Sequence, residues 1–267
     1  MSDGTFDTHP ARRSGRTRFE DDLGRPVVSD APPRRIVSLV PSLTEAIAHT
    51  VPGALVGATD WCSHPPDLAV ERLRGTKNPH VRRIIELAPD LVVANREENR
   101  ERHVLHLREA GVPVWVTDVR TVPGALASLR RLFALLAPGV SPDWLTEAET
   151  VWAAPPPSER VRVAVPIWRN PWMFVGADTF AHDLLHRLGA DNVFADRPGR
   201  YPTVGPEETS EADLVVLPDE PYAFGPEDGP EAFDVPAVHV FGRDLTWYGP
   251  SLPAAHRRLS AALTRHG

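Results

Sequence analysis

The sequence predicts an α/β protein with two similar Rossmann-like lobes, each built on a parallel sheet, joined by a helical backbone and with a ligand cleft between them. Short, continuously apolar runs alternate with amphipathic helical patterns, which is typical of parallel βα units covered on both faces. The tetrapeptide Asp-Leu-Val-Val begins at Asp90 and again, 123 residues later, at Asp213. Val-Pro precedes the next apolar run at Val112 and Val235, which is the same offset. This agreement indicates an internal repeat.

The predicted strands follow the apolar runs in chain order. In the first half they are expected at 34–40, 54–60, 90–95 and 112–117, with helices over 43–51 and 81–88. In the second half they are expected at 160–167, 192–195, 213–218 and 236–242. The order of strands and helices is therefore the same in both halves.

Two helical patterns connect the halves, at 123–137 and 141–154. Ser141 is expected to cap the second helix, with Pro142 at its first position. Three prolines at 155–157 stiffen the exit. The predicted organisation is a flexible segment over 1–34, an N-terminal lobe over 35–121, a helical connector over 122–158 and a C-terminal lobe over 159–267.

Composition narrows the classes of partner and location. A net charge of −7 gives no overall electrostatic support for a nucleic-acid partner. Cys62 is the single cysteine, so an intrachain disulfide is excluded. The N-terminal residues contain no apolar run of the kind a secretory signal needs. The expected location is therefore the cytoplasm, without membrane insertion.

Candidate ligand-binding residues are those that follow the predicted strands, because parallel α/β sheets bind ligands beyond the carboxyl ends of their strands. These residues are Trp61, Cys62, Lys77, Asn78, Asn95, Arg96, Trp168, Arg169, Trp172, Arg243, Asp244, Trp247 and Tyr248. Aromatic rings with a few charges suit a flat, largely apolar ligand with polar edges. We expect Trp168 and Trp172 to face Trp61 across the cleft, with Arg169 contacting a polar edge. The alternative is that these rings fill gaps between loops and core.

Four segments carry a family resemblance: "RRIVSLVPSLTEAIAHT", "LVGATDWCSHPP", "APDLVVANREEN" and "LREAGVPVWV". Together they resemble the helical-backbone substrate-binding proteins of ABC importers, of the vitamin B12-, siderophore- and haem-binding types. The resemblance implies two lobes bridged by a rigid helix and a metal chelate, such as cobalamin, held without a covalent bond. It also implies docking on an ABC permease through one surface glutamate per lobe, here Glu71 and Glu207 or its neighbour Glu208.

The sequence gives less support to a metal site made of side chains or to a catalytic centre. Cys62 with His64, or His182 with His186, offers too few ligands for a protein-held metal. Neither a nucleophile elbow nor a phosphate-binding loop is present in the sequence. The acidic run at 97–101 is expected to be the solvated first turn of a helix. Asp60 and Asp244 could meet across the cleft as an acid–base pair.

Three functions therefore remain open. Non-catalytic binding of a metal chelate, which the resemblance indicates to be a corrinoid, is the favoured interpretation. The alternative is a cytoplasmic enzyme that uses the same cleft on a small molecule or a metal chelate. The third is a sensor or partner-binding module without chemistry.

Overall fold

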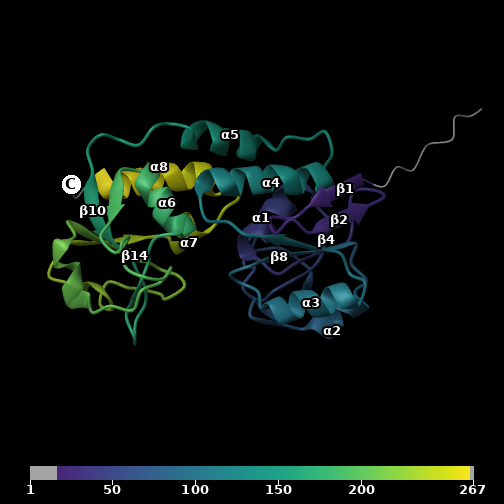
Figure 1. The fold of residues 1–267 in the computed structure, drawn as a ribbon, viewed down its shortest axis with the longest axis horizontal. Helices are drawn as coiled ribbons and strands as arrows, with labels where there is room; N and C mark the ends of the chain where they lie inside the picture. Colours follow the sequence, from purple (N-terminus) through teal and green to yellow (C-terminus); the bar gives the residue numbers. More distant parts are fainter. Residues whose placement is uncertain (1–16, 265–267) are drawn as a thin grey trace, which may run out of the picture.

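Two parallel sheets lie side by side in the computed structural model, which describes residues 17–264 (Figure 1). The first sheet has the order β5-β4-β3-β8-β9. Its strands are β3 (Ile36–Ser38), β4 (Leu55–Ala58), β5 (Glu71–Arg72), β8 (Leu91–Asn95) and β9 (Val114–Thr117). The second sheet has the order β13-β10-β14-β15. Its strands are β10 (Val161–Ala164), β13 (Ala190–Asn192), β14 (Leu214–Pro218) and β15 (Ala237–Val240). The predicted α/β class with two parallel sheets is confirmed.

The two sheets share one topology. The order β4-β3-β8-β9 in the first matches β13-β10-β14-β15 in the second. Strands β8 and β14 begin at Leu91 and Leu214, and strands β9 and β15 begin at Val114 and Ala237. Both pairs are 123 residues apart, so the offset seen in the sequence joins equivalent strands.

Helices cover the faces of both sheets. Around the first sheet lie α1 (Pro41–Thr50), α2 (Val81–Glu86) and α3 (Glu101–Glu109). Around the second lie α6 (Phe180–Arg187), α7 (Gly242–Thr246) and α8 (Leu252–Thr264). Within residues 17–264, none of the helices combines the length and apolar composition that crossing a bilayer requires.

Short elements complete the fold at the rims of the sheets. Two-stranded ribbons are formed by β6 (Arg74–Gly75) with β7 (Asn78–Pro79), and by β11 (Pro166–Trp168) with β12 (Met173–Phe174). Two 3-10 turns, η1 (Pro206–Glu211) and η2 (Pro230–Ala232), lie in the second half of the chain.

Two helices, α4 (Val122–Leu136) and α5 (Asp143–Trp152), connect the sheets. Thr121 caps α4 by accepting a hydrogen bond from the backbone N of Gly124 at 3.1 Å. Helix α5 begins one residue later than expected: Pro142 is its N-cap, and the Ser141 hydroxyl lies near Arg130 and Thr146 instead. The sequence pattern located both helices but misplaced this cap.

Contacts at the ends of these helices reach both lobes. The backbone N of Val122, at the start of α4, donates to Asp183 of α6 at 2.7 Å. In α5, Trp144 Nε1 donates to Thr50 at the end of α1, and Trp152 Nε1 donates to Leu252 O at the start of α8, both at 3.1 Å. In Figure 1, α4 and α8 lie along one side of both sheets, and α5 lies outside them. One apolar cluster contains buried residues from both sheets and from α1, α4, α5, α6 and α8, and so spans the two lobes.

A β-hairpin precedes the first sheet, formed by β1 (Thr17–Glu20) and β2 (Pro26–Ser29). Its turn is tied down by two acids. Asp21 accepts from Arg108 at 2.9 Å, and Asp22 accepts from Ser128 Oγ at 2.7 Å and from the backbone N of Asp118 at 3.0 Å. Of the segment expected to be flexible over 1–34, residues 1–16 lie outside the described residues. Residues 17–29 are ordered, because these hydrogen bonds fix the hairpin on β9 and α4.

Substitution Asp22→Ala tests this attachment. It removes the acceptor for a backbone N–H, a hydroxyl and the Arg131 guanidinium, so we expect the free energy of unfolding to fall by about 2–3 kcal/mol. Urea denaturation followed by circular dichroism measures the change. Asp67→Ala, which removes an exposed carboxylate, is the matched control, and equal stability of the two variants would contradict the attachment.

Candidate functional site

The loops that follow the strands of the two sheets meet between the lobes and enclose a cavity of about 390 Å³. The loop after β4 contributes Ser63 and His64. The second half of the chain contributes Asp219, Glu220, Phe241, Arg243, Trp247 and Arg258. The candidate site therefore lies where parallel α/β sheets place their ligands, beyond the carboxyl ends of their strands.

Three ion pairs cross between the lobes beside this cavity. Arg243 contacts Glu45 of α1 at 2.6 Å. Arg200 contacts Glu97, in the turn after β8, at 3.1 Å, and Arg120 contacts Asp178 at 2.5 Å. The first two pairs neutralise a carboxylate of the first lobe with an arginine of the second. They fix the spacing between the lobes at the site.

The segment after α7 crosses from the second lobe onto the first. The hydroxyl of Tyr248 accepts a hydrogen bond from Asn95 Nδ2 at 2.9 Å and lies 3.1 Å from Thr117 Oγ1. The Arg243 guanidinium carbon lies over the Trp247 ring, 4.9 Å from the centre of that ring. The Trp247 ring also meets the His64 ring edge-on, with 5.4 Å between the two ring centres. Trp247 and Tyr248 are buried, and burial raises the pKa of Tyr248. Trp247 and Tyr248, both predicted as ligand-binding residues, therefore lie at the junction of the two lobes, where Trp247 lines the cavity.

Exposed aromatic rings occur in a restricted set of places. Among residues 17–264 the exposed aromatic side chains are Trp61, Trp168 and Phe241, at 67%, 44% and 57% of full exposure. Trp168 ends β11, Phe241 directly follows β15, and Trp61 lies in the loop that follows β4. The first lobe thus presents one ring and the second lobe two. Phe241 was not among the predicted site residues, although it lies near the end of the apolar run predicted at 236–242.

Trp172 and Arg169 do not extend this exposed set. The Trp172 ring stacks on Phe224 with centroids 5.8 Å apart and an interplanar angle of 3°, and it also contacts Phe233. The Arg169 guanidinium covers Trp172 and forms ion pairs with Asp228 and Glu231. The prediction that Trp172 faces Trp61 is therefore wrong, because its ring belongs to an aromatic cluster beneath the second sheet. The charge of Arg169 is likewise already paired.

Two further predicted site residues are enclosed. The Cys62 thiol accepts a hydrogen bond from Thr44 at 2.9 Å, and burial raises its pKa. Both carboxylate oxygens of Asp244 are held by Arg258, at 2.6 and 2.5 Å. Asp244 therefore does not pair with Asp60, and the proposed acid–base pair is not formed. Within the described part of the chain, three or more metal-binding side chains do not converge anywhere.

Asn95 organises the turn after β8 rather than presenting its amide to a ligand. Its side-chain oxygen accepts from the backbone N of Glu97 at 2.8 Å and of Glu98 at 3.1 Å. Since its Nδ2 also donates to Tyr248, one buried amide fixes both the turn and the crossing segment. The other predicted residues of this rim, Lys77, Asn78 and Arg96, are exposed; Arg96 is paired with Asp118 at 2.8 Å.

Glu98 is the most perturbed acid of the site. Burial raises the pKa of Glu98 to about 7, with further contributions from Glu97 and Glu220, and Lys77 opposes the shift. The expected solvated helical turn at 97–101 is wrong here, because α3 begins only at Glu101 and the preceding Glu97 and Glu98 are half-buried in a turn. Burial likewise raises the pKa of Glu220 in the second lobe. Glu97 and Glu220 are 123 residues apart, so the internal repeat was the signal that could have located this pair of acidic turns.

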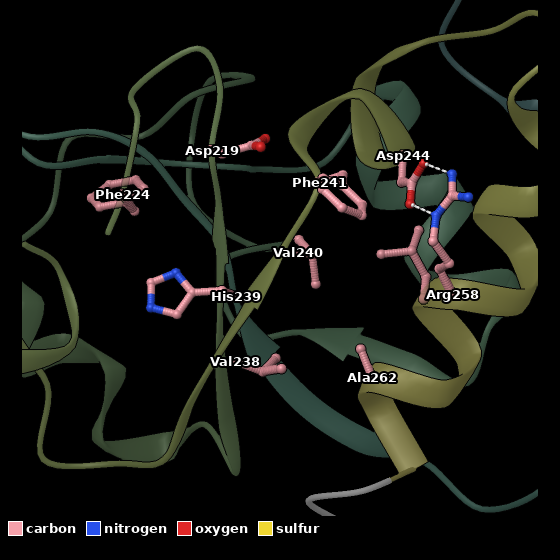
Figure 2. A pocket seen from close by; sticks show the side chains of 10 residues that line it. Asp219, Phe224, Val238, His239, Val240, Phe241, Asp244, Arg258 and Ala262 are labelled. Atoms are coloured by element: carbon pink, nitrogen blue, oxygen red, sulfur yellow. Dashed lines mark hydrogen bonds and ion pairs between the residues drawn. The ribbon is translucent and has the colours of Figure 1, made fainter. Parts of the chain in front are cut away.

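A second cavity of about 410 Å³ adjoins the first and shares Asp219, Phe241 and Arg258 with it. Figure 2 shows it along β15, with Val238 and Val240 on one side and Ala262 of α8 on the other. The dashed lines mark the two contacts from Arg258 to Asp244. Phe241 therefore lies where the apolar groove opens into the polar inter-lobe cavity.

Substitution of two tryptophans distinguishes a ring that packs in the protein from a ring that is exposed to solvent. Trp172→Ala removes a ring from the aromatic cluster, so we expect the free energy of unfolding to fall by about 2–4 kcal/mol. Trp168→Ala removes a largely exposed ring and is expected to cost less than about 1 kcal/mol. Urea unfolding of the two variants, followed by circular dichroism, measures both. Equal losses would mean that Trp168 is as much part of the packing as Trp172.

The Glu98 carboxyl predicts a specific pH dependence of stability. Since its folded pKa of about 7 lies above its ordinary value of 4.5, the folded protein holds a proton that the unfolded chain has lost between these pH values. The free energy of unfolding should therefore fall as pH rises through this window. Glu98→Gln should flatten the dependence and be more stable than wild type by about 1–3 kcal/mol at about pH 8. Glu109→Gln, an exposed change of equal charge, should leave the profile unchanged.

Comparisons with known proteins agree with this architecture. No protein-family model matches the chain. The chain is 31% identical over 180 residues to the vitamin B12-binding protein of Salmonella typhimurium, covering 65% of this chain and 67% of that protein. It is 27% identical over 248 residues to the vitamin B12-binding protein of Pectobacterium carotovorum, covering 87% and 89%.

Solved structures show the same fold. The periplasmic vitamin B12-binding protein of Vibrio cholerae matches with a TM-score of 0.72 at 19% identity, over 88% of this chain and 98% of that one. The periplasmic haem-binding protein of Roseiflexus sp. RS-1 matches with a TM-score of 0.74 at 19% identity, over 87% and 98%.

These similarities overturn the expected cytoplasmic location. Both solved structures are of periplasmic proteins, which points to the periplasm instead. The extent and identity of the match to the Salmonella protein also decide the family. The chain belongs to the vitamin B12-binding proteins, which are ABC-transporter substrate-binding proteins of the helical-backbone type.

Proposed function

We propose that this chain is a non-catalytic receptor that binds a metal chelate, a corrinoid such as cobalamin, at the mouth of the inter-lobe cleft. The observation that carries this proposal is the placement of Trp61, Trp168 and Phe241. These are the exposed aromatic rings of residues 17–264: Phe241 lines the inter-lobe cavity, Trp61 lies in the loop after β4 that also carries the cavity residues Ser63 and His64, and Trp168 ends β11. The vitamin B12-binding names of the relatives support the same class of ligand.

Physical chemistry favours a flat ligand for such rings. A large exposed aromatic face is poorly hydrated, and stacking it on a macrocycle removes apolar surface from water on both partners. Trp61 comes from the first lobe and Trp168 from the second. A planar chelate between them would be held from two sides, while the exposed Lys77, Asn78 and Arg96 offer polar contacts to its edge.

The shared core supports binding without large lobe movement. Because buried residues of both lobes pack in one apolar cluster with α4, α5 and α8, separating the lobes would expose apolar surface. The Arg243–Glu45 and Arg200–Glu97 pairs add restraints at the cleft itself. Small loop and side-chain adjustments are therefore the favoured response to a ligand.

Delivery to an ABC permease is part of this proposal. Glu71 on β5 and Glu207 in η1 are exposed carboxylates, one on each lobe. Glu71 is held by Arg83 at 3.0 Å, which fixes its orientation at the surface. Two acids at separate positions suit a basic surface on a transporter.

The double variant Trp61→Ala/Trp168→Ala tests the proposed stacking of the ligand on these two rings. We expect cyanocobalamin affinity to fall by about ten- to a hundredfold, because two stacking contacts of about 0.5–1.5 kcal/mol and their buried area are lost. Isothermal titration calorimetry measures the affinity, and thermal melting checks the fold.

The matched control is Leu105→Ala/Val140→Ala, which removes two exposed apolar side chains from α3 and from the α4–α5 loop. Affinity should then stay at the wild-type value. Unchanged affinity in the tryptophan double variant would overturn the proposed stacking of the ligand on these rings. Failure of wild type to bind any chelate would overturn the proposed function.

A further inference from the structure

Strand β15 forms an open edge of the second sheet, because β14 is the one strand paired with it in the described part of the chain. Val215 N donates to Pro236 O at 2.8 Å, so the peptide groups of the alternate residues Val238 and Val240 face β14. The backbone N–H and C=O of His239 therefore face the outer edge. The strand, Ala-Val-His-Val, contains none of the lysine side chains that commonly block such edges.

The equivalent edge of the first sheet is covered. Strand β9 begins 123 residues before β15, so Val116 is the counterpart of His239. The C=O of Val116 accepts from the backbone N of Asp22 at 3.1 Å, and its N–H donates to Asp21 Oδ2 at 3.3 Å. All of β9 is buried, whereas His239 is exposed. Main chain from the β1–β2 hairpin thus covers the edge of β9, and within residues 17–264 no turn hydrogen-bonds to the outer edge of β15 in this way.

An apolar groove runs along the open edge of β15. This groove is the cavity of about 410 Å³ described above. Figure 2 shows Val238 and Val240 on the side of the strand that faces Ala262 of α8, and His239 on the other side. Since side chains of both faces line the groove, it follows the edge of β15 rather than one face of the sheet. An added strand would find free peptide groups at this edge and apolar surface for its side chains.

The chain between β14 and β15 is strongly acidic. Residues 219–235 contain neither lysine nor arginine. Two of the acids in this segment form ion pairs with Arg169. The acids of the segment are Asp219, Glu220, Glu227, Asp228, Glu231 and Asp234.

Negative charge lies at both ends of the groove. Asp234 is exposed and precedes the first residue of β15 by three positions. At the other end Asp219 lines the groove, where its Oδ1 accepts from the backbone N of Gly242 at 2.6 Å. Arg258 also lines the groove, but both carboxylate oxygens of Asp244 hold its guanidinium. The groove therefore offers an apolar middle and acidic ends.

We propose that an extended segment of a partner protein binds the open edge of β15 as an additional strand. The segment is apolar in its middle and carries lysine or arginine at its ends. Its main chain hydrogen-bonds to the outer N–H and C=O of His239, and its apolar side chains occupy the groove. Its basic side chains meet Asp219 and Asp234. This surface is distinct from the proposed chelate site, although Phe241 borders both cavities.

The same charges disfavour pairing of β15 with a second copy of itself. Two-fold antiparallel pairing places the start of one strand beside the end of the other. Asp234 of one protomer would then approach Asp219 of its partner at both ends of the interface. Because like charges facing each other across strands are destabilising, a strand of opposite charge is the favoured occupant.

The probe is the acetylated and amidated peptide Lys-Val-Thr-Val-Thr-Lys. We expect it to bind wild type with a Kd below about 1 mM and to shift the amide resonances of His239 and Phe241 in NMR spectra. Two matched peptides are tested on the same protein. One has glutamate at both ends, and the other has N-methyl groups on alternate peptide nitrogens, which removes the donors of a pairing edge. Each should bind at least about tenfold more weakly.

Two variants of His239 provide the corresponding change in the protein. His239→Pro removes the outward N–H and leaves the hydrogen bonds to β14 in place, and proline is tolerated at a sheet edge in this orientation. His239→Val keeps the N–H and removes the imidazole. The lysine peptide should bind at least about tenfold more weakly to His239→Pro and within about threefold of wild type to His239→Val. Thermal melting checks the fold, and the peptide series on wild type decides the question if the proline variant is unstable.

The outcomes decide among the possible occupants of the edge. Absence of binding to wild type, or equal binding of the lysine, glutamate and N-methylated peptides, would overturn the proposal. A dimer in sedimentation velocity that His239→Pro abolishes would overturn it in favour of self-pairing. Because these experiments use neither a chelate nor the inter-lobe cleft, their failure would leave the proposed receptor function intact.

Discussion

The shared apolar core is the constraint on which the rest of this structure depends. It runs from the first sheet through α4, α5 and α8 into the second sheet, with residues as far apart as Val27 and Leu263 in one cluster. Separating the lobes would expose much of that cluster, at about 25 cal/mol for each Å² of apolar surface. The two sheets are therefore held at a fixed spacing, and the site between them is largely formed before a ligand arrives.

That constraint explains why the polar contacts between the lobes are so specific. Once the core has set the spacing, the carboxyl ends of the strands are close enough for Arg243 to contact Glu45 and for Tyr248 to meet Asn95.

The fold could be predicted from the sequence because its two signals, the apolar runs and the internal repeat, can be recognised in the sequence itself. Apolar runs mark strands directly, and the offset between Asp90 and Asp213 aligned β8 with β14 without any knowledge of tertiary contacts. The site was less predictable. Trp168 and Trp172 have the same local signature, yet one is exposed and the other stacks on Phe224, more than 50 residues away in the chain. A loop position gives the place of a residue but not the side to which its ring turns.

Partners distant in the sequence also determine the surroundings of the charged residues. The acids after β8 look like a solvated helix start, but α3 begins later and the turn is held inward by the buried amide of Asn95. Cys62, Asp244 and Tyr248 were expected at a ligand surface and are instead satisfied by Thr44, Arg258 and Asn95. Only the repeat, which relates Glu97 to Glu220, carried information about the acidic turns that follow β8 and β14.

The crossing of Tyr248 onto the first lobe has a consequence for how the chain is made. Asn95 and Thr117 acquire the Tyr248 hydroxyl as a partner only when a residue 153 positions beyond Asn95 is available. During synthesis, the first lobe can therefore assemble its sheet early, since neighbouring strands form as they emerge, but the turn that carries Glu98 stays without its final support until almost the whole chain has left the ribosome. Completion of the cleft is thus a late event in the synthesis of the chain.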